Sequence, residues 1–382
     1  MSLRKPSLTS QITHCPVPFH LDTYMGCTFG CHYCFARDLV VFARRNSDHP
    51  SFSYLVPNDH VAFERWLDKV MVTEEDDKKK PEDVALRERL VLKIGANSDP
   101  LPYAEKKHHV TQNVLRALHK YDYPTEIQTK NPRGLLAFAD QFTNPNWTIA
   151  VTLISTDEKF VKCCEPTAPT VEDRLSAIKE LTAMGLKVMV KIQPCIYPKI
   201  LADLPDLVKA IKEAGCWAFN TEGLKLRIAM PTHEQEKIKH MQEYVGEDIR
   251  EFYKKNRNLD NHSDYELCNE LRLEYTNMAI QLAEQYGLRY FSADNGMGCI
   301  GCSDECCGTE VLRNYKLWRH NTRSFAFQAT DKHAGKLDDC FCNFIRAAVH
   351  SRDTQMTIKE TVDDRLGTNI PIIEYEEDWW ED

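Results

Sequence analysis

Three cysteines stand close together near the start of the chain, in the stretch GCTFGCHYC (26–34), with the spacing C-x3-C-x2-C. A structural zinc site normally takes four ligands, and no fourth candidate follows closely. A cubane iron–sulfur cluster has four irons, each of which needs one ligand besides its sulfides. Three cysteines leave one iron open, and an open metal position favours chemistry over scaffolding. Cys27, Cys31 and Cys34 therefore predict a [4Fe–4S] cluster, the alternative being a zinc knuckle that borrows a distant fourth ligand.

The composition limits the class of protein. Lys and Arg number 48 against 57 Asp and Glu, a net charge of −9 over 382 residues. A long nucleic-acid footprint needs clustered positive charge, so this balance argues against a polymer ligand, although a local basic groove is compatible with it. The N-terminus has no apolar signal-peptide region, and no run approaches the about 18 apolar residues of a membrane span. With 15 cysteines, the sequence predicts a cytoplasmic protein with reduced thiols and bound metal, and no membrane partner.

Short apolar runs alternate with helical stretches over most of the chain. Runs rich in β-branched residues and bounded by turn residues predict strands at 89–96, 125–130, 147–154 and 186–194. A helix is predicted over 170–185, with Thr170 as its N-cap. Residues 206–220 and 278–293 each predict a helix followed by a strand. This alternation is typical of parallel strands with crossover helices, so we expect an α/β sheet or barrel.

The alternation ends near residue 299, where a cysteine-rich segment begins. We expect a barrel domain at 1–298 and a C-terminal extension packed on it at 299–382. The charged run EEDDKKKPED (74–83) predicts a solvated loop.

With the aromatic Tyr33 before its last cysteine, the cysteine motif resembles that of the radical S-adenosylmethionine superfamily. The resemblance implies a partial (β/α)6 TIM-like barrel with the cluster in the loop after the first strand, at the edge where barrel sites lie. It implies that S-adenosylmethionine chelates the open iron. An electron from a donor such as flavodoxin or ferredoxin then breaks a carbon–sulfur bond, and the 5′-deoxyadenosyl radical takes a hydrogen atom from the substrate.

Other stretches resemble the spore photoproduct lyase-like branch, namely GANSDPLPYAE (95–105), TKN (129–131) and STDEKFVKCCEPTAPTVEDRLSAIKELTAMGLKV (155–188). Polar groups at these strand ends must hold an amino-acid zwitterion and a ribose. Ser98 or Asp99 is expected to accept from the ammonium group, and Lys130 or Arg174 to pair with the carboxylate. The residues expected to bind the cosubstrate are Tyr33, Ser98, Asp99, Lys130, Ser155, Arg174 and Gln193. The alternative for each strand-end group is a plain turn or a charge at a helix N-terminus.

The C-terminal cysteines have three open interpretations. Those in GCIGCSDECCGTE (298–310) are Cys299, Cys302, Cys306 and Cys307, and Cys340 and Cys342 follow. They ligate an auxiliary iron–sulfur cluster or a zinc ion, or one of them is the thiol that quenches a substrate radical, or they are small buried hydrophobes. A second metal site at the first four is the interpretation we favour, and the quenching thiol is not identified.

Branch membership implies a nucleobase or nucleoside substrate, and the acidic balance favours a small one. A lyase that frees the base queuine from the nucleoside queuosine is of this type and is the specific function we expect. A guanine-like edge presents N–H donors, for which a carboxylate is the natural acceptor, and the candidates are Asp294, Asn295 and Glu222. The alternatives are repair of a thymine lesion in DNA, supported by YKLWRHNTRSF (315–325), and a non-enzymatic iron–sulfur module that binds nucleic acid.

Overall fold

The fold is taken from a computed structural model. It describes residues 3–8, 17, 19–46, 51–72, 81–230, 232–259, 261, 264–294, 306–321 and 326–329. Of the expected extension at 299–382, only 306–321 and 326–329 belong to this part of the chain. Within the described ranges, none of the helices combines the length and the hydropathy that a bilayer-spanning helix needs.

The central element is an eight-stranded sheet in the order β1-β2-β5-β6-β7-β8-β9-β12. Its last seven strands run parallel, and only β1 pairs antiparallel at one edge. The expected α/β fold is confirmed, with seven parallel strands where six were expected. The sheet strands are β1 (Ser7–Leu8), β2 (Phe19–Leu21), β5 (Leu92–Ile94), β6 (Thr125–Thr129), β7 (Trp147–Thr152), β8 (Val188–Cys195), β9 (Ala218–Gly223) and β12 (Arg289–Ser292).

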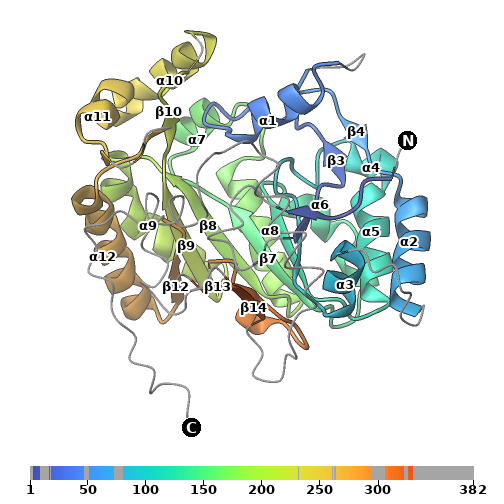
Figure 1. The fold of residues 1–382 in the computed structure, drawn as a ribbon. Coiled ribbons are helices and arrows are strands. Elements are labelled where there is room, and N and C mark those ends of the chain that lie inside the picture. The colour runs from blue at the N-terminus through green and yellow to red at the C-terminus, as the bar shows by residue number, and fades with distance from the viewer. Residues whose placement is uncertain are drawn as a thin grey trace.

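In the described ranges, three two-stranded ribbons lie outside this sheet: β3 (Tyr24–Met25) with β4 (Val56–Pro57), β10 (Leu226–Arg227) with β11 (Asp264–Tyr265), and β13 (Trp318–Asn321) with β14 (Ala326–Ala329). In Figure 1, α1, α7 and α10 lie at the upper end of the sheet and β13 and β14 at its lower end. The helices are α1 (Ala36–Ala43), α2 (His60–Val72), α3 (Pro81–Arg87), α4 (Glu105–His108), α5 (Val110–His119), α6 (Pro132–Leu136), α7 (Glu158–Cys164), α8 (Val171–Ala183), α9 (Lys199–Glu213), α10 (Thr232–Val245), α11 (Ile249–Lys255) and α12 (Asn269–Tyr286), with 3-10 turns η1 (Ala139–Gln141) and η2 (Thr309–Val311).

The main hydrophobic core fills the space between the sheet and its helices. Alternate strand residues contribute to it, for example Ile127 on β6, Ile149 and Val151 on β7, and Val190 on β8. Side chains of successive strand residues point to opposite faces, so the residues between these positions face the other side of the sheet. That inner face carries a smaller apolar cluster of Ala150, Met189, Ala218 and Phe291. Other strand residues on the inner face are polar, among them Glu126, Thr148 and Lys191.

The predicted elements agree with the structure in type. The four predicted strands correspond to β5, β6, β7 and β8, and the predicted helix at 170–185 is α8. Thr170 caps that helix, because its side chain accepts from the Asp173 amide at 3.1 Å. The prediction of a loop over 74–83 is wrong at its end, since Pro81–Asp83 form the first turn of α3, where proline is well tolerated.

Residues 306–317 cross the amino-terminal edge of the sheet. The Val91 amide donates to the Lys316 carbonyl at 3.3 Å, just before β5. Asn146, just before β7, accepts from the Arg313 amide at 2.8 Å and donates to the Arg313 carbonyl at 2.8 Å. The start of the C-terminal segment thus packs against the barrel, and the residues that it contacts are distant from it in sequence.

The Asn146 side chain is a test of this contact. It is 2% exposed and also donates to the Asp122 carbonyl at 2.9 Å. Asn146→Ala removes three partly buried hydrogen bonds to backbone groups of Arg313 and Asp122, each worth about 0.5–1.5 kcal/mol. We expect the free energy of unfolding, measured by urea denaturation, to fall by about 2 kcal/mol or more. Thr143→Ala, an exposed change on the same loop, should alter it by less than about 0.5 kcal/mol. Equal stability of the two variants would contradict the contact.

Candidate active site

The three N-terminal cysteines lie in the loop between β3 and α1, at the carboxyl edge of the sheet. Their thiols pack in one small cluster with the buried side chains of Phe29 and Ala168. The loop begins at Gly26, which has φ +95° and whose α-carbon lies so close to two carbonyl groups that a Cβ would stand 2.5 Å from the Tyr54 oxygen. Only glycine fits this turn. The His32 amide donates to the Cys164 carbonyl at 2.8 Å and ties the loop to α7.

The environment of the thiols is suited to a metal cluster. Burial, with a smaller contribution from the Asp99 carboxylate, raises the pKa of Cys27 to about 11. Burial also raises the pKa of Cys31, opposed by the nearby Lys130 ammonium. Each of the three thiols lies within electrostatic range of the other two. Coordination to iron would supply the positive charge that such buried thiolates need.

Among the described residues, no three or more His, Cys, Asp and Glu side chains converge closely enough to hold a single metal ion. A cubane cluster makes a different demand, because each cysteine bonds a different iron and the thiols need only border one common space. The donor set of Cys27, Cys31 and Cys34 fits that demand.

A buried carboxylate, Glu165, lies behind the cysteine loop and was not singled out from the sequence. It is 1% exposed and accepts hydrogen bonds from the Tyr33 hydroxyl and the Arg174 guanidinium. The Lys130 ammonium lies 4.0 Å from its Oε1 atom and 5.5 Å from the Tyr33 ring centroid. Glu165 stands in CCEP, within the stretch 155–188 that resembles the spore photoproduct lyase-like branch, and that resemblance was the available signal.

The charged and polar groups around Glu165 shift one another's pKa values. Burial opposes the Lys130 ammonium, but the neighbouring Cys31 thiol and Glu165 carboxylate outweigh it and raise the pKa of Lys130. Burial and the Glu165 carboxylate raise the pKa of Tyr33, which keeps the phenol as a hydrogen-bond donor. Lys130 keeps 18% of its side chain exposed, so it is able to meet a ligand.

Arg174 occupies a different position from the one expected for a ligand contact. Its side chain is 0% exposed, donates to the carbonyls of Pro169 and Thr152 at 3.0 Å each, and donates to Glu165. With no exposed surface, Arg174 acts on the site through Glu165. Of the two cations expected to pair with a carboxylate, Lys130 alone has surface for it.

Asp99 and Ser98 lie in the loop after β5, next to the cysteine loop. The Asp99 carboxylate accepts from the Thr129 hydroxyl at 2.8 Å, the Lys130 amide at 2.7 Å and the Leu101 amide at 2.9 Å. Burial raises the pKa of Asp99 in spite of these hydrogen bonds. Ser98 is buried, and its hydroxyl donates to the Tyr24 carbonyl. Asp99 thereby joins the ends of β5 and β6 beside Cys27.

Ser155 and Gln193 come from the next strands. The buried Ser155 hydroxyl accepts from the Asp157 amide at 3.0 Å, an arrangement that leads the chain from β7 into α7. Gln193 is half-buried near the end of β8. Five of the expected cosubstrate residues thus follow one another along the carboxyl ends of β5 to β8, namely Ser98, Asp99, Lys130, Ser155 and Gln193, while Tyr33 lies in the cysteine loop and Arg174 on α8.

The substrate carboxylates expected after the last strands have partners within the protein. Asp294 is 3% exposed, and it accepts from the Gly223 amide at 2.9 Å and the Tyr275 hydroxyl at 2.6 Å. These bonds favour an anchoring role that joins the ends of β9 and β12 to α12. Glu222 pairs with Lys225 at 2.7 Å, and Asn295 lies outside the described residues.

Of the four C-terminal cysteines, Cys306 and Cys307 are described and Cys299 and Cys302 are not. Cys307 is 0% exposed in an apolar cluster with Val17, Val91, Leu312 and Leu317. Its sulfur lies 3.9 Å from that of Cys306, which packs on the inner-face cluster. This pair lies at the amino-terminal edge of the sheet, and the three N-terminal cysteines lie at the carboxyl edge.

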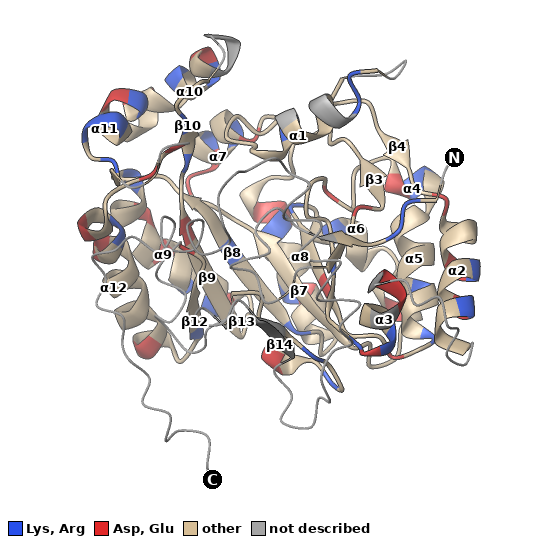
Figure 2. Cartoon of the chain, in the orientation of Figure 1, with Lys and Arg blue, Asp and Glu red and all other residues tan. Residues whose placement is uncertain are grey.

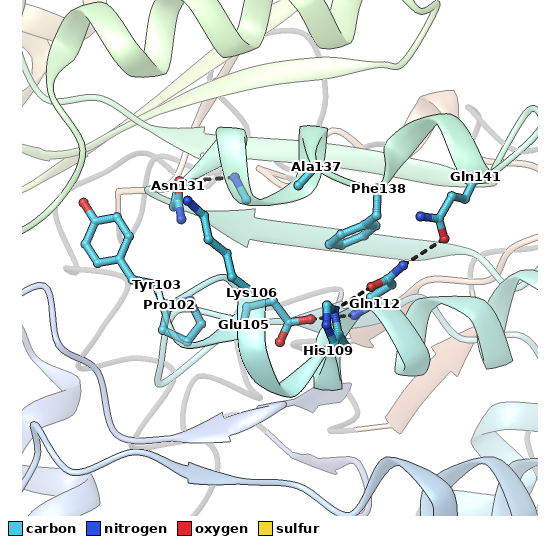
Figure 3. A pocket seen from close by; sticks show the side chains of 11 residues that line it. Pro102, Tyr103, Glu105, Lys106, His109, Gln112, Asn131, Ala137, Phe138 and Gln141 are labelled. Carbon is cyan, nitrogen blue, oxygen red and sulfur yellow. Dashed lines mark hydrogen bonds between the residues drawn. The ribbon is translucent and has the colours of Figure 1, made fainter.

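A pocket of about 180 Å³ opens between α4, α5 and α6, close to the Asp99 loop (Figure 3). The carboxylate at its base, Glu105, accepts from the amides of Val110 and Gln112 at 3.0 and 2.9 Å and from the Tyr24 hydroxyl. These bonds fasten α4 to α5, so Glu105 has a structural function and we assign no ligand to this pocket.

Comparison with known proteins supports the fold. A variant of spore photoproduct lyase with bound S-adenosylmethionine and dinucleoside spore photoproduct superposes with a TM-score of 0.53 and 14% identity, covering 76% of this chain and 80% of that one. A second variant, with the dinucleoside alone, gives a TM-score of 0.52 and 13% identity over the same shares. The chain therefore has the partial-barrel α/β fold of that enzyme.

No protein-family model matches the chain. Uncharacterised proteins of Mycobacterium tuberculosis and Mycobacterium bovis are 26% identical over 221 residues, which is 56% of this chain. The chain spans 60% of the length of these relatives.

The pairing of Arg174 with Glu165 gives a prediction. Arg174→Met leaves the Glu165 carboxylate buried without its closest cation, and breaking a buried pair in this way costs about 3–5 kcal/mol. We expect urea denaturation to show a loss of that size. Combining it with Glu165→Gln removes the unpaired charge, so the double variant should be more stable than Arg174→Met alone. A loss below about 1 kcal/mol for Arg174→Met would contradict a buried ion pair.

Proposed function

We propose that this chain is a radical S-adenosylmethionine enzyme. The observation that carries the proposal is the convergence of the buried Cys31 and the partly buried Cys27 and Cys34 in one group at the carboxyl edge of the barrel, next to Lys130 and Asp99. A [4Fe–4S] cluster held there by the three cysteines would supply one electron to bound S-adenosylmethionine and so its reductive cleavage to methionine and a 5′-deoxyadenosyl radical.

Several residues of the chain would orient the cosubstrate. The partly exposed Lys130 would pair with its carboxylate, while Glu165 and Tyr33 hold the lysine in place. Asp99 would accept from its ammonium group. A carboxylate has about four acceptor positions, and Asp99 uses three of them within the protein. Ser98, Ser155 and Gln193 complete the edge that would face the ribose.

A reduced electron donor is required, and we propose a small flavodoxin or ferredoxin. Phe35, which directly follows Cys34, is 70% exposed, and Leu39 on α1 is 49% exposed. Apolar side chains this close to the cysteine loop offer a contact surface near the acceptor of the electron.

For the substrate, we propose a free nucleoside, with queuosine lyase activity that releases queuine as the specific reaction. The support is the net negative charge of the chain and its resemblance to the spore photoproduct lyase-like branch. Over the described residues, Figure 2 shows blue and red segments next to each other on helices such as α3, α10 and α11. Such mixing suits a small neutral ligand better than a phosphate backbone.

The second candidate is repair of a thymine lesion in DNA. One observation favours it: a structure with the same fold was solved with a dinucleoside spore photoproduct bound. A third candidate, a non-enzymatic iron–sulfur module that binds nucleic acid, would share the cysteine site without cosubstrate cleavage.

Cosubstrate cleavage is tested with cysteine variants. Cys27→Ala, Cys31→Ala and Cys34→Ala each remove one iron ligand, so each should abolish formation of 5′-deoxyadenosine by anaerobic, reconstituted and reduced protein, measured by mass spectrometry. Cys216 is buried in the main hydrophobic core, so Cys216→Ala should retain the activity. Substantial 5′-deoxyadenosine from any of the three variants would contradict the assignment. No cleavage by the wild-type protein would favour the non-enzymatic module.

Salt dependence separates the nucleoside from DNA. Each phosphate that a protein neutralises contributes about −0.9 to the slope of log K against log salt concentration. A nucleoside has no phosphates, so we expect turnover of the free nucleoside with a shallow slope and no preference for lesion-bearing duplex. Duplex binding that weakens steeply with salt, together with no activity on any nucleoside, would make DNA repair the better proposal.

A further inference from the structure

The cysteine loop comes close to the protein surface at Phe29. This side chain is 1% exposed and packs in the same cluster as the three thiols. Its outer neighbour is Tyr103, whose ring stands edge-on to the Phe29 ring, with 5.8 Å between the centroids and 73° between the planes. Tyr103 itself is 51% exposed. One buried ring therefore separates the thiol cluster from an exposed aromatic side chain.

Basic side chains follow Tyr103 on the short helix α4 and at its end. Four of them in a row are exposed: Lys106, Lys107, His108 and His109. The acidic residue of α4, Glu105, is buried and bonded within the protein. Tyr103, Lys106 and His109 border the same pocket (Figure 3), so they share one continuous surface. We call Tyr103 together with residues 106–109 the α4 face.

The two lysines of the α4 face have charge available for a partner. Within the described part of the chain, neither Lys106 nor Lys107 forms an ion pair. The Lys120 ammonium, just after α5, lies by contrast 2.8 Å from the Asp68 carboxylate. Cations at the end of a helix also interact with its dipole, but an exposed tyrosine contributes nothing to that interaction. In a chain of net charge −9, the α4 face is thus a local basic surface with an aromatic contact.

The chemistry proposed for the cysteine loop needs a partner near this surface. Reductive cleavage of S-adenosylmethionine consumes one electron, which an outside donor must supply. Electron transfer weakens steeply with distance, so the donor must dock where the thiols lie close to the surface. Encounters between electron-transfer proteins are weak and bury less than about 1,200 Å². A small surface with one aromatic side chain and unpaired charge is therefore sufficient for them.

We propose that the α4 face docks the electron donor, and that the donor is a small one-electron carrier with an acidic surface. Acidic groups on the donor would meet Lys106 and Lys107, and an apolar group would cover Tyr103. The donor is oxidised by one electron, the metal group held by the three cysteines is reduced by one, and no bond forms or breaks. The inference rests on the proposed enzymatic function and deepens it by naming the surface and the charge of the donor.

A nucleic acid is the other class of ligand that a basic surface suggests, and it fits less well. Glu172 and Asp173 at the start of α8 are exposed. Asp173 lies within electrostatic range of the Tyr103 hydroxyl. A phosphate backbone that crossed the α4 face would meet these carboxylates, which oppose its binding. A compact acidic partner would contact only the basic side of Tyr103.

Binding of a [2Fe–2S] ferredoxin of net negative charge tests the proposal without any turnover. We expect the full-length protein to bind it with an affinity that falls as the salt concentration rises, measured by isothermal titration calorimetry. Lys106→Glu combined with Lys107→Glu should weaken binding by about ten-fold or more, and Tyr103→Ser should weaken it by several-fold. Unchanged binding in the double variant, or no binding by the wild-type protein, would overturn the proposal.

Lys254→Glu combined with Lys255→Glu is the matched control. These lysines are also adjacent and exposed in the last turn of a short helix, α11. In Figure 1, α11 lies at the left and α4 at the right. Both double variants add the same negative charge to the chain, so the control should keep ferredoxin binding. An equal loss in the two would indicate general repulsion, and the docking face would be refuted.

A chemical reductant separates docking from the rest of the enzyme. With limiting reduced ferredoxin, formation of 5′-deoxyadenosine by the α4 double variant should fall by about ten-fold or more. With dithionite, which needs no docking surface, the variant should match the wild-type protein. An equal loss with both reductants would contradict a docking function. No cleavage by the wild-type protein with either reductant, together with ferredoxin binding that the α4 variant loses, would remove the enzymatic proposal alone.

Two other results would assign the surface differently. If Phe35→Ser abolished ferredoxin binding and the α4 double variant retained it, the donor would dock on α1 and this inference alone would fall. If the wild-type protein bound duplex DNA but no ferredoxin, and the α4 double variant lost the DNA, the face would belong to a nucleic acid.

Discussion

The candidate site depends on the contacts that the buried Glu165 carboxylate makes. A buried carboxylate is tolerated only when it is paired and hydrogen-bonded, and here Arg174, Tyr33 and Lys130 supply those partners. The three come from α8, from the cysteine loop and from the end of β6. Because one charge holds all of them, the loop that carries the thiols, the strand edge and the helix behind them are fixed relative to one another.

The two faces of the sheet have different functions because of the alternation of side chains along each strand. Residues such as Ile127, Ile149 and Val190 pack on the helices and stabilise the fold. The residues between them place charges in the barrel, where low polarity strengthens their interactions. A single set of parallel strands therefore supplies both a hydrophobic core and a polar interior. Asp99 and Lys130 follow the ends of two of these strands, and together with Glu165, which follows α7, they surround the cysteine loop.

Local patterns in the sequence were sufficient for the strands β5 to β9 and β12, for α8 with its cap at Thr170, and for the grouping of Asp99 with Lys130 at neighbouring strand ends. Partners far apart in sequence were not accessible in this way. Glu165 becomes notable only when it meets Tyr33, 132 residues away. Glu126 stands within a correctly predicted strand, but its ion pairs are with two lysines that β5 and β8 place beside it, and the sequence of β6 alone does not predict them. Asp294 was expected to face a ligand, and its bonds to Gly223 and Tyr275 are tertiary contacts that no local window contains.

The covering of the amino edge by residues 306–317 has a consequence for how the chain folds. Its contacts close very long loops, with a sequence separation of 167 from Asn146 to Arg313 and of 228 from Glu88 to Lys316. During synthesis from the N-terminus, the strands of the barrel leave the ribosome well before this segment does. Until it arrives, Val91 at the bottom of β5 lacks the cover that Leu312 and Leu317 provide. The last step of folding is thus the closing of a contact of high sequence separation, which is entropically slow. A nascent chain that stalls before this segment exposes apolar surface at the edge of its sheet, where chaperones and neighbouring chains bind.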